Sequence, residues 1–280
     1  MLASAAAPAS QRVRCRQIAE SDFDDLAGLL MEGFPLHDKT YWQKGLDRMA
    51  GLATIEGLPR FGHVLESDEG LAGALLIIAS RRGERIHANV SGWYVRPAYR
   101  AHSTMLVLTA TRLKHVIYIN ASPAPHTWRT LEATGWKPYN FGRSAAFPWL
   151  DFRGGRVVAT IPDDLPEKTL LEDHRQWGCV SLICEENGRP SPFVFRPRWI
   201  MRPPLPMMEL IYCRSMAELE RCGGALARYF LPRGHAGLLF DGKVTNFAAY
   251  YAPGKEPRFY KGPTPPDLND LAYTEKVIFG

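Results

Sequence analysis

The pattern of apolar and polar residues predicts a chain that mixes strands and helices. Residues 12–18 alternate as in a strand, and apolar residues at helical spacing follow over residues 21–34. Ser21 is the expected N-cap of that helix, because its hydroxyl can accept a backbone N–H. The acidic first turn suits the positive end of the helix dipole (Asp22, Asp24 and Asp25). A second helix is predicted over residues 40–52.

A run of strand signals follows these helices. The turn Asp68-Glu69-Gly70 separates two apolar segments, residues 60–67 and 71–80, which are therefore expected to pair as a β-hairpin. The other elements predicted for this half are a strand at 86–95, a helix at 103–114, a strand at 115–120, and a helix at 124–134 that ends at Gly135 as its C-cap. With one more strand, the order becomes β-α-α-β-β-β-α-β-α-β.

Residues 151–280 repeat this order in a shorter form. The predicted elements are a strand at 156–162, a helix at 166–177, a hairpin at 179–198 that turns at Glu186-Asn187-Gly188, a strand at 207–213, a helix at 215–230 and a strand at 235–242. The proline-rich residues 196–208 are expected to connect strands rigidly. Residues 252–280 are expected to form a loop rich in proline and glycine, followed by a strand at 271–279. The repeat indicates a duplicated α/β chain with a mixed sheet.

Length and composition favour two domains. At 280 residues the chain exceeds the size at which one core stops growing, and 46% hydrophobic with 22% charged residues is typical of a globular protein. We predict a disordered tail at residues 1–11 and domains at 12–150 and 151–280. The tail lacks the basic start and apolar stretch of a secretion signal, and the longest apolar run, at 71–80, is too short to span a membrane. A cytoplasmic protein is therefore expected.

Charge and cysteines narrow the classes of ligand. A net charge of +5 suits a ligand with phosphates, but no basic block occurs, so a nucleic acid is not an expected partner. The five cysteines form no C-x-x-C pair, which indicates buried thiols in a reducing cytoplasm. The sequence has no spacing typical of metal ligands, of a P-loop or of a nucleophile elbow, and no metal is expected.

Two segments carry a resemblance to a known family. They are VRPAYRAHSTML at residues 95–106 and YINASPAPHTWRTLEATGW at residues 118–136. Together they resemble the acetyl-CoA-binding half of the GNAT (GCN5-related) N-acyltransferases, and the resemblance covers about residues 12–142. Because the element order occurs twice, the implied architecture is a tandem GNAT-like fold, a doubling known in mycothiol synthase and N-myristoyltransferase. The implied activity moves an acyl group from acetyl-CoA or another acyl-CoA to an acceptor, most simply an amine of a small molecule.

The resemblance also implies where the cofactor binds. In the family, backbone N–H groups of an (Arg/Gln)-x-x-Gly-x-(Gly/Ala) loop at a helix N-terminus hold the pyrophosphate. Arg100 takes the first motif position, while Ser103 and Met105 replace the glycines. A polar residue after the fifth strand bonds the pantetheine arm or acetyl region; here it is Asn120, which could instead be a helix cap. The expected cofactor-binding residues are Tyr94, Val95, Arg100, Ala101, His102, Ser103, Thr104, Met105 and Asn120.

The second half lacks this cofactor motif. Its corresponding segment, YCRSMAELERC, keeps only Arg214, and Ser215 with Glu218 forms a capping box that satisfies the helix N-terminus by itself. One cofactor site is therefore expected, and residues 151–280 are assigned to part of the acceptor cleft.

The usual acid and base of the family are absent. The motif alignment places the base at Asn89 and the acid at Leu131, and neither side chain can exchange a proton at neutral pH. On a regular strand His87, Asn89, Ser91 and Trp93 share one face, so His87 is the candidate base and Asn89 its catalytic neighbour. The alternative is a histidine hydrogen-bonded within the sheet. Two other functions also fit: a transferase that uses aminoacyl-tRNA or an acyl-carrier protein, and a non-catalytic acyl-CoA-binding protein.

Overall fold

The computed structural model describes residues 12–200 and 204–280, which form two compact units. Unit 1 ends at Leu113 and also includes Phe279, and unit 2 runs from Lys114 onward. This division differs from the predicted domain boundary at residue 150, which separates the two repeated series of elements. The domain boundary at residue 150 stays a prediction. In the described part of the chain, no helix is long and apolar enough to cross a membrane.

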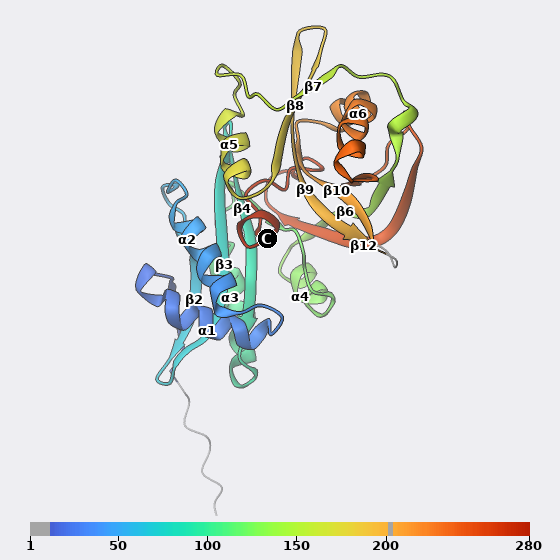
Figure 1. The fold of residues 1–280 in the computed structure, drawn as a ribbon. Helices are drawn as coiled ribbons and strands as arrows, with labels where there is room; N and C mark the ends of the chain where they lie inside the picture. The colour runs from blue at the N-terminus through green and yellow to red at the C-terminus, as the bar shows by residue number, and fades with distance from the viewer. Residues whose placement is uncertain (1–11, 201–203) are drawn as a thin grey trace, which may run out of the picture. The chain divides into compact units, whose positions relative to one another are not determined.

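Unit 1 contains an antiparallel sheet with helices around it (Figure 1). The strand order follows the chain: β1 (Arg14–Gln17), β2 (Gly62–Ser67), β3 (Gly70–Arg82) and β4 (Arg85–Val95). Helices α1 (Phe23–Gly33) and α2 (Lys39–Ala50) connect β1 to β2, and α3 (Ser103–Ala110) follows β4. The β2–β3 hairpin turns where the sequence predicts it, with Ser67 paired to Gly70.

The start of α1 corrects one expectation. A short 3-10 turn, η1 (Glu20–Asp22), precedes the helix, so Ser21 lies inside that turn and is not the N-cap. The Asp22 carboxylate instead accepts the N–H of Ala19 at 2.8 Å and pairs with Arg16 at 2.7 Å. A carboxylate that can bind both a backbone donor and an arginine replaces the weaker hydroxyl acceptor here.

Unit 2 contains a mixed sheet with the order β5-β12-β6-β11-β10-β9-β8-β7. The strands are β5 (Val116–Asn120), β6 (Lys137–Ala146), β7 (Arg156–Val158), β8 (Val180–Glu186), β9 (Arg189–Ile200), β10 (Leu205–Cys213), β11 (Gly237–Asp241) and β12 (Ala249–Lys261). The helices are α4 (Trp128–Ala133), α5 (Lys168–Gln176), α6 (Met216–Phe230) and α7 (Glu275–Ile278). The β8–β9 turn is confirmed, and Asn187 and Gly188 both have the positive φ that a tight hairpin turn needs.

The two series of elements exchange their last strands. The strand that ends the first series, β6, pairs antiparallel with β11 of the second series. The strand that ends the second series, β12, pairs antiparallel with β5 of the first series. Since β12 and β6 also pair with each other, the exchanged strands lie side by side between β5 and β11 in the unit 2 sheet.

The largest corrections concern the C-terminal segment. Strand β12 occupies much of the stretch expected to be a loop, and its register shifts between Pro253 and Arg258, where Gly254 and Glu256 have positive φ. This bulge accommodates the proline and glycine, which interrupt the alternation of apolar and polar residues by which a strand is predicted. The strand predicted at 271–279 is also wrong, because that stretch contains α7. Of the proline-rich stretch at 196–208, both ends belong to strands β9 and β10, and residues 201–203 lie outside the described residues.

Helix α6 packs on one face of the unit 2 sheet. The core beneath it is apolar and includes Phe193, Phe195, Met208, Leu210 and Phe240. Residues that alternate with these along the same strands therefore point to the other face, and several of them are charged.

Candidate functional site

A β-bulge near the end of β4 determines which side chains share its face. Ser91 pairs with Leu76 and Tyr94 with Ala74, so Gly92 and Trp93 both lie opposite the single residue Leu75. Gly92 has a φ of +53°, and a β-carbon there would lie 2.9 Å from the Leu76 side chain. Glycine is thus required by both conformation and space.

The bulge changes the predicted set of neighbours. Because paired residues of antiparallel strands point to the same face, Tyr94 joins His87, Asn89 and Ser91 on the face of Leu76. Trp93 does not, so the expectation that it shares this face is wrong. The ring of Tyr94 lies against Gly33 of α1, where any side chain would collide with it.

His87 and Asn89 are deeply buried on β4. They pair with Ser80 and Ile78 of β3 and are 5% and 3% exposed. A proton-transfer role for His87 therefore requires an acceptor or a water molecule that enters the unit. His63, by contrast, pairs with Leu75 and so lies on the opposite face of the sheet.

The segment after β4 is helical throughout. A 3-10 helix, η2 (Pro97–His102), runs directly into α3, and the N–H of Ser103 donates to the carbonyl of Arg100. The Arg100 and Ala101 side chains are exposed, as are Thr104 and Met105, while His102 and Ser103 are partly buried. The expected open loop is therefore a tight turn in which at least one amide is already bonded within the chain.

Two side-chain contacts hold this turn. Arg96, at the end of β4, forms a paired contact with Glu32 at 2.9 and 2.6 Å, which lowers the pKa of Glu32 below its usual value. Tyr99 is buried, and its hydroxyl donates to Glu69 at 3.2 Å. The structure thus brings Tyr94, Val95 and the residues from Arg100 to Met105 together on one continuous strand–turn–helix of unit 1.

Asn120 belongs to unit 2. It is the last residue of β5, its backbone pairs with Phe259 of β12, and it is 8% exposed. Among residues 12–200 and 204–280 its side-chain amide makes no hydrogen bond, and the amide atoms are not shielded from solvent. The next helical turn, η3 (Pro125–Thr127), has Ala124 at its N-cap, so Asn120 is not a helix cap.

The position predicted for the missing acid is also buried. Leu131 lies on α4 with no exposed surface and belongs to the apolar core. The assignment of the family's acid to this position stays a prediction.

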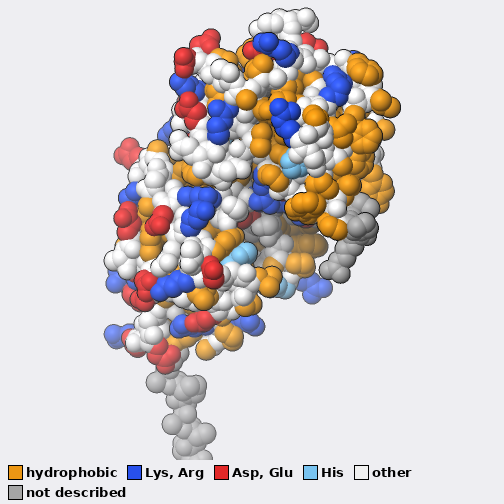
Figure 2. Space-filling model, viewed as in Figure 1, with side chains coloured by type: hydrophobic (Ala, Val, Ile, Leu, Met, Phe, Trp, Pro, Cys, Tyr) orange, Lys and Arg blue, Asp and Glu red, His pale blue; other side chains and the backbone are white. Residues whose placement is uncertain are grey.

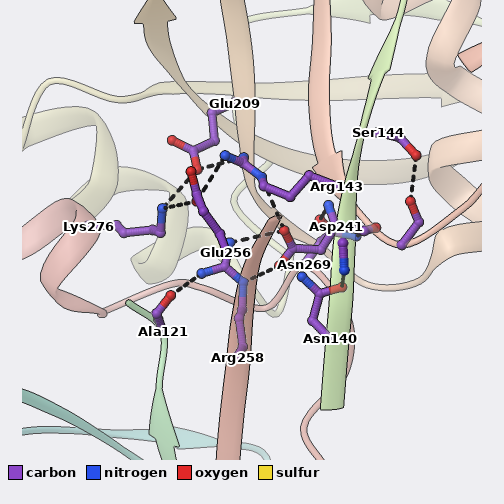
Figure 3. A network of polar contacts seen from close by, with 12 residues as sticks. Ala121, Asn140, Arg143, Ser144, Glu209, Asp241, Glu256, Arg258, Asn269 and Lys276 are labelled. Carbon is purple, nitrogen blue, oxygen red and sulfur yellow. Dashed lines mark hydrogen bonds and ion pairs between the residues drawn. The ribbon is translucent and has the colours of Figure 1, made fainter. Parts of the chain in front are cut away.

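Unit 2 contains a buried ionic network that the sequence analysis missed (Figure 3). Glu209 of β10 has no exposed surface and accepts from Arg143 of β6 at 2.7 Å, Arg196 of β9 at 2.9 Å and Lys276 of α7 at 3.1 Å. Glu256 of β12 joins the same cluster through Arg143, Arg198 and Lys276. The signal in the sequence was the alternation of charged with core residues along β9 and β10, on the face away from α6.

The cations decide the charge state of these carboxylates. Burial alone raises the pKa of Glu209, but Lys276, Arg143 and the neighbouring arginines hold it well below its usual range. Burial acts the same way on Glu256, and the same cations bring its pKa to about 2. Both groups are therefore ionised at neutral pH, and the network is a set of paired charges, not an acid–base site.

Sequence comparison identifies no relatives. No family model matches the chain, and no curated protein matches it.

Solved structures with the same fold are known. A GCN5-related N-acetyltransferase from Anabaena variabilis superposes with a TM-score of 0.58 at 10% identity, covering 89% of this chain and 72% of that one. A GCN5-related N-acetyltransferase from Kribbella flavida gives 0.54 at 15% identity, with 90% and 71% covered. A protein from Pyrococcus horikoshii gives 0.54 at 13% identity, with 93% of each chain covered. The chain therefore has the mixed α/β fold of the GCN5-related N-acetyltransferases over nearly its whole length.

Proposed function

We propose that this chain is an acyl-CoA-dependent acyltransferase that transfers an acetyl or longer acyl group to an amine of a small molecule. The observation that carries the proposal is the bulged end of β4 and the helical turn that follows it, in a chain with this fold. A bulge interrupts the strand ladder and leaves backbone groups free to bond an extended ligand.

The candidate residues fit an acyl-CoA in part. In support, the amide of Asn120 reaches solvent from a residue that is only 8% exposed and makes no hydrogen bond to the described residues. Arg100 is exposed and able to pair with a phosphate. Against a full phosphate cradle, the amide of Ser103 is bonded to Arg100. We assign phosphate binding to Arg100 and the segment Ala101–Met105, and contact with the pantetheine arm to Tyr94 and Val95 of unit 1. Asn120 of unit 2 stays a separate prediction for the same arm.

A bound acyl-CoA supplies an activated thioester, and the protein has to orient the amine and remove its proton. We assign proton removal to a ring nitrogen of His87, with Asn89 two positions away on the same face of β4. Both residues are buried, so the proton of the amine reaches His87 in one of two ways. It passes through an ordered water, or it is taken directly from an acceptor molecule that reaches the sheet. The role of residues 151–280 in the acceptor cleft stays a prediction.

A second candidate function is acyl-CoA binding without catalysis. The observation that favours it is the complete burial of Leu131, which leaves the departing thiolate without a proton donor at that position. A tRNA-dependent transferase has less support, since it needs a broad basic surface. On the face shown in Figure 2, Lys and Arg side chains are interspersed with Asp and Glu.

Two measurements test these functions in sequence. Thermal shift with CoA, acetyl-CoA and a long-chain acyl-CoA asks whether any of them binds, because a ligand of the native state raises the melting temperature. Release of free CoA thiol in the presence of primary amines then asks whether the bound acyl group is transferred. Binding with transfer supports the enzyme, binding without transfer supports the non-catalytic protein, and absence of binding refutes both.

A further inference from the structure

Arg258 of β12 contacts β11 and the residue that follows β5 from a fully buried position. Its side chain has no exposed surface, and it pairs with Asp241 of β11 through two nitrogens, one of them at 3.0 Å. Its third nitrogen donates to the backbone carbonyl of Ala121. All three nitrogens of the guanidinium are therefore used, and only a planar fork of donors can make this set of contacts.

The contact with Ala121 lies next to the proposed cofactor residue. Asn120 pairs with Phe259, the neighbour of Arg258, so two consecutive residues of β12 hold two consecutive residues at the end of β5. Backbone pairing sets the position of Asn120, and the Arg258 contact fixes the peptide that follows it. Together they fix the direction in which the chain leaves β5.

The other side of the Arg258 contact is also held in place. Asp241 donates its backbone N–H to the side chain of Asn269 at 2.7 Å, and the Asn269 amide donates back to the Asp241 carbonyl at 3.1 Å. Arg143 lies 3.4 Å from the Asp241 carboxylate. Figure 3 shows Arg258, Asp241, Asn269 and Arg143 close together. Arg258 therefore connects the end of β5 to a carboxylate whose own position is fixed.

The side chain of Asn120 points to a ligand at this place. It is 8% exposed and, within the described residues, has no hydrogen-bond partner. Its amide atoms still reach solvent, so an amide or thioester carbonyl of a bound molecule can replace water as their partner.

We propose that Arg258 is a positioning residue that aligns Asn120 to bind the pantetheine arm of an acyl-CoA. The inference rests on the proposed function, and it adds a residue that touches no ligand itself. An ion pair this deeply buried often contributes little net stability compared with apolar side chains, so its contribution here is geometric.

A double-mutant cycle on CoA binding tests the inference. Asn120→Ala and Arg258→Gln are each expected to weaken the Kd for CoA about tenfold by titration calorimetry, and the double variant is expected to be no weaker than the weaker single variant. Lys276→Gln is the matched control, because it removes a buried cation of the same network that does not contact Ala121 or Asp241. Its Kd is expected to stay at the wild-type value.

A second variant and a second readout keep the test independent of folding. Asp241→Asn preserves the shape of the Arg258 partner, and it is expected to weaken CoA binding in the same direction if Arg258→Gln does not fold. In the absence of ligand, the backbone amides of residues 116–122 are expected to exchange hydrogen faster in Arg258→Gln and Asp241→Asn than in wild type. Lys276→Gln is expected to show no such change. The inference is overturned if the fold-changes in Kd of Asn120→Ala and Arg258→Gln multiply in the double variant. It is also overturned if Kd is unchanged in both Arg258→Gln and Asp241→Asn. If wild-type protein does not bind CoA, the proposed function itself has failed.

Discussion

Arg100 is the exposed cation on the turn after β4, and the proposed phosphate contact depends on it. Arg100→Ala is expected to weaken CoA binding by about 1.5–3 kcal/mol, the range of a charge-assisted hydrogen bond. Titration calorimetry measures the change directly. Arg14→Ala, which removes an exposed arginine on β1 of the same unit, serves as the control and should leave the Kd unaltered. Equal affinities for wild type and Arg100→Ala refute the phosphate assignment.

His87 is the residue on which the proposed acid–base chemistry depends. His87→Gln keeps a buried polar side chain of similar size but cannot titrate, and turnover is expected to fall at least about tenfold with cofactor affinity nearly unchanged. The acidic limb of the pH–rate profile should disappear with it. His63→Gln is the matched control, because it alters another buried histidine on the opposite face of the same sheet. If His87→Gln retains the turnover and pH profile of wild type, His87 is structural.

At the scale of elements, the bulge in β4 is the feature to test. A side chain at Gly92 must adopt a φ of +53° and meet Leu76 at 2.9 Å, so Gly92→Ala is expected to lower the free energy of unfolding by about 1–3 kcal/mol. Urea denaturation measures the change. Gly28→Ala is the matched control on α1: nothing lies within 4 Å of its new β-carbon, and alanine favours the helix, so a stability gain of up to about 1 kcal/mol is expected. A Gly92→Ala protein as stable as wild type contradicts the bulge.

Local patterns predicted most elements because each depends on neighbouring residues. The Asp68-Glu69-Gly70 turn and the cap at Ser215, whose hydroxyl accepts from the N–H of Glu218 at 3.2 Å, are satisfied within a few residues of the chain. Strand β12 could not be predicted in this way. It forms because β5 and β6 offer two free edges, and proline and glycine at its bulge hide the alternation.

The same distinction applies to the candidate site. A motif alignment locates Arg100 and Asn120, since it needs only sequence order. It cannot show that Gly92 shifts Tyr94 onto the face of Asn89, because one inserted residue in a strand changes every later orientation. Nor can it find Arg258, whose partners Ala121 and Asp241 come from distant strands.

At the scale of the whole molecule, the ionic network predicts how stability depends on pH. Glu256 has a pKa of about 2 in the folded protein and about 4.3 when unfolded, so its contribution is complete above the unfolded value and is lost as pH falls toward 2. Glu209 acts in the same direction. Wild type should therefore lose stability steeply between about pH 4.5 and 2, and Glu256→Gln less steeply. Denaturation across that range measures both slopes; Glu132→Gln, a change at an exposed α4 residue outside the network, is the control. Identical slopes for wild type and Glu256→Gln contradict this account.

The two series of elements also predict the number of ligands per chain. In the second series the N-terminus of α6 is capped by Ser215, and Arg214 is already bound to Glu167 at 2.6 and 2.7 Å. The arginine is therefore already paired there, and the N–H of Glu218 at the helix N-terminus is already bonded. Titration calorimetry is expected to report one CoA per chain, and two equivalent sites would contradict the comparison of the two series.

The exchange of β6 and β12 has a consequence for how the protein is made. Strand β5 ends at Asn120 and leaves the ribosome long before β12, which begins at Ala249, has been synthesised. Until then β5 and β6 have unpaired edges, which are sites where other chains can add strands and aggregate. We therefore expect that neither series of elements folds alone after proteolysis or separate expression, because each lacks the strand that the other provides. The two series of elements are therefore expected to fold only as parts of one chain.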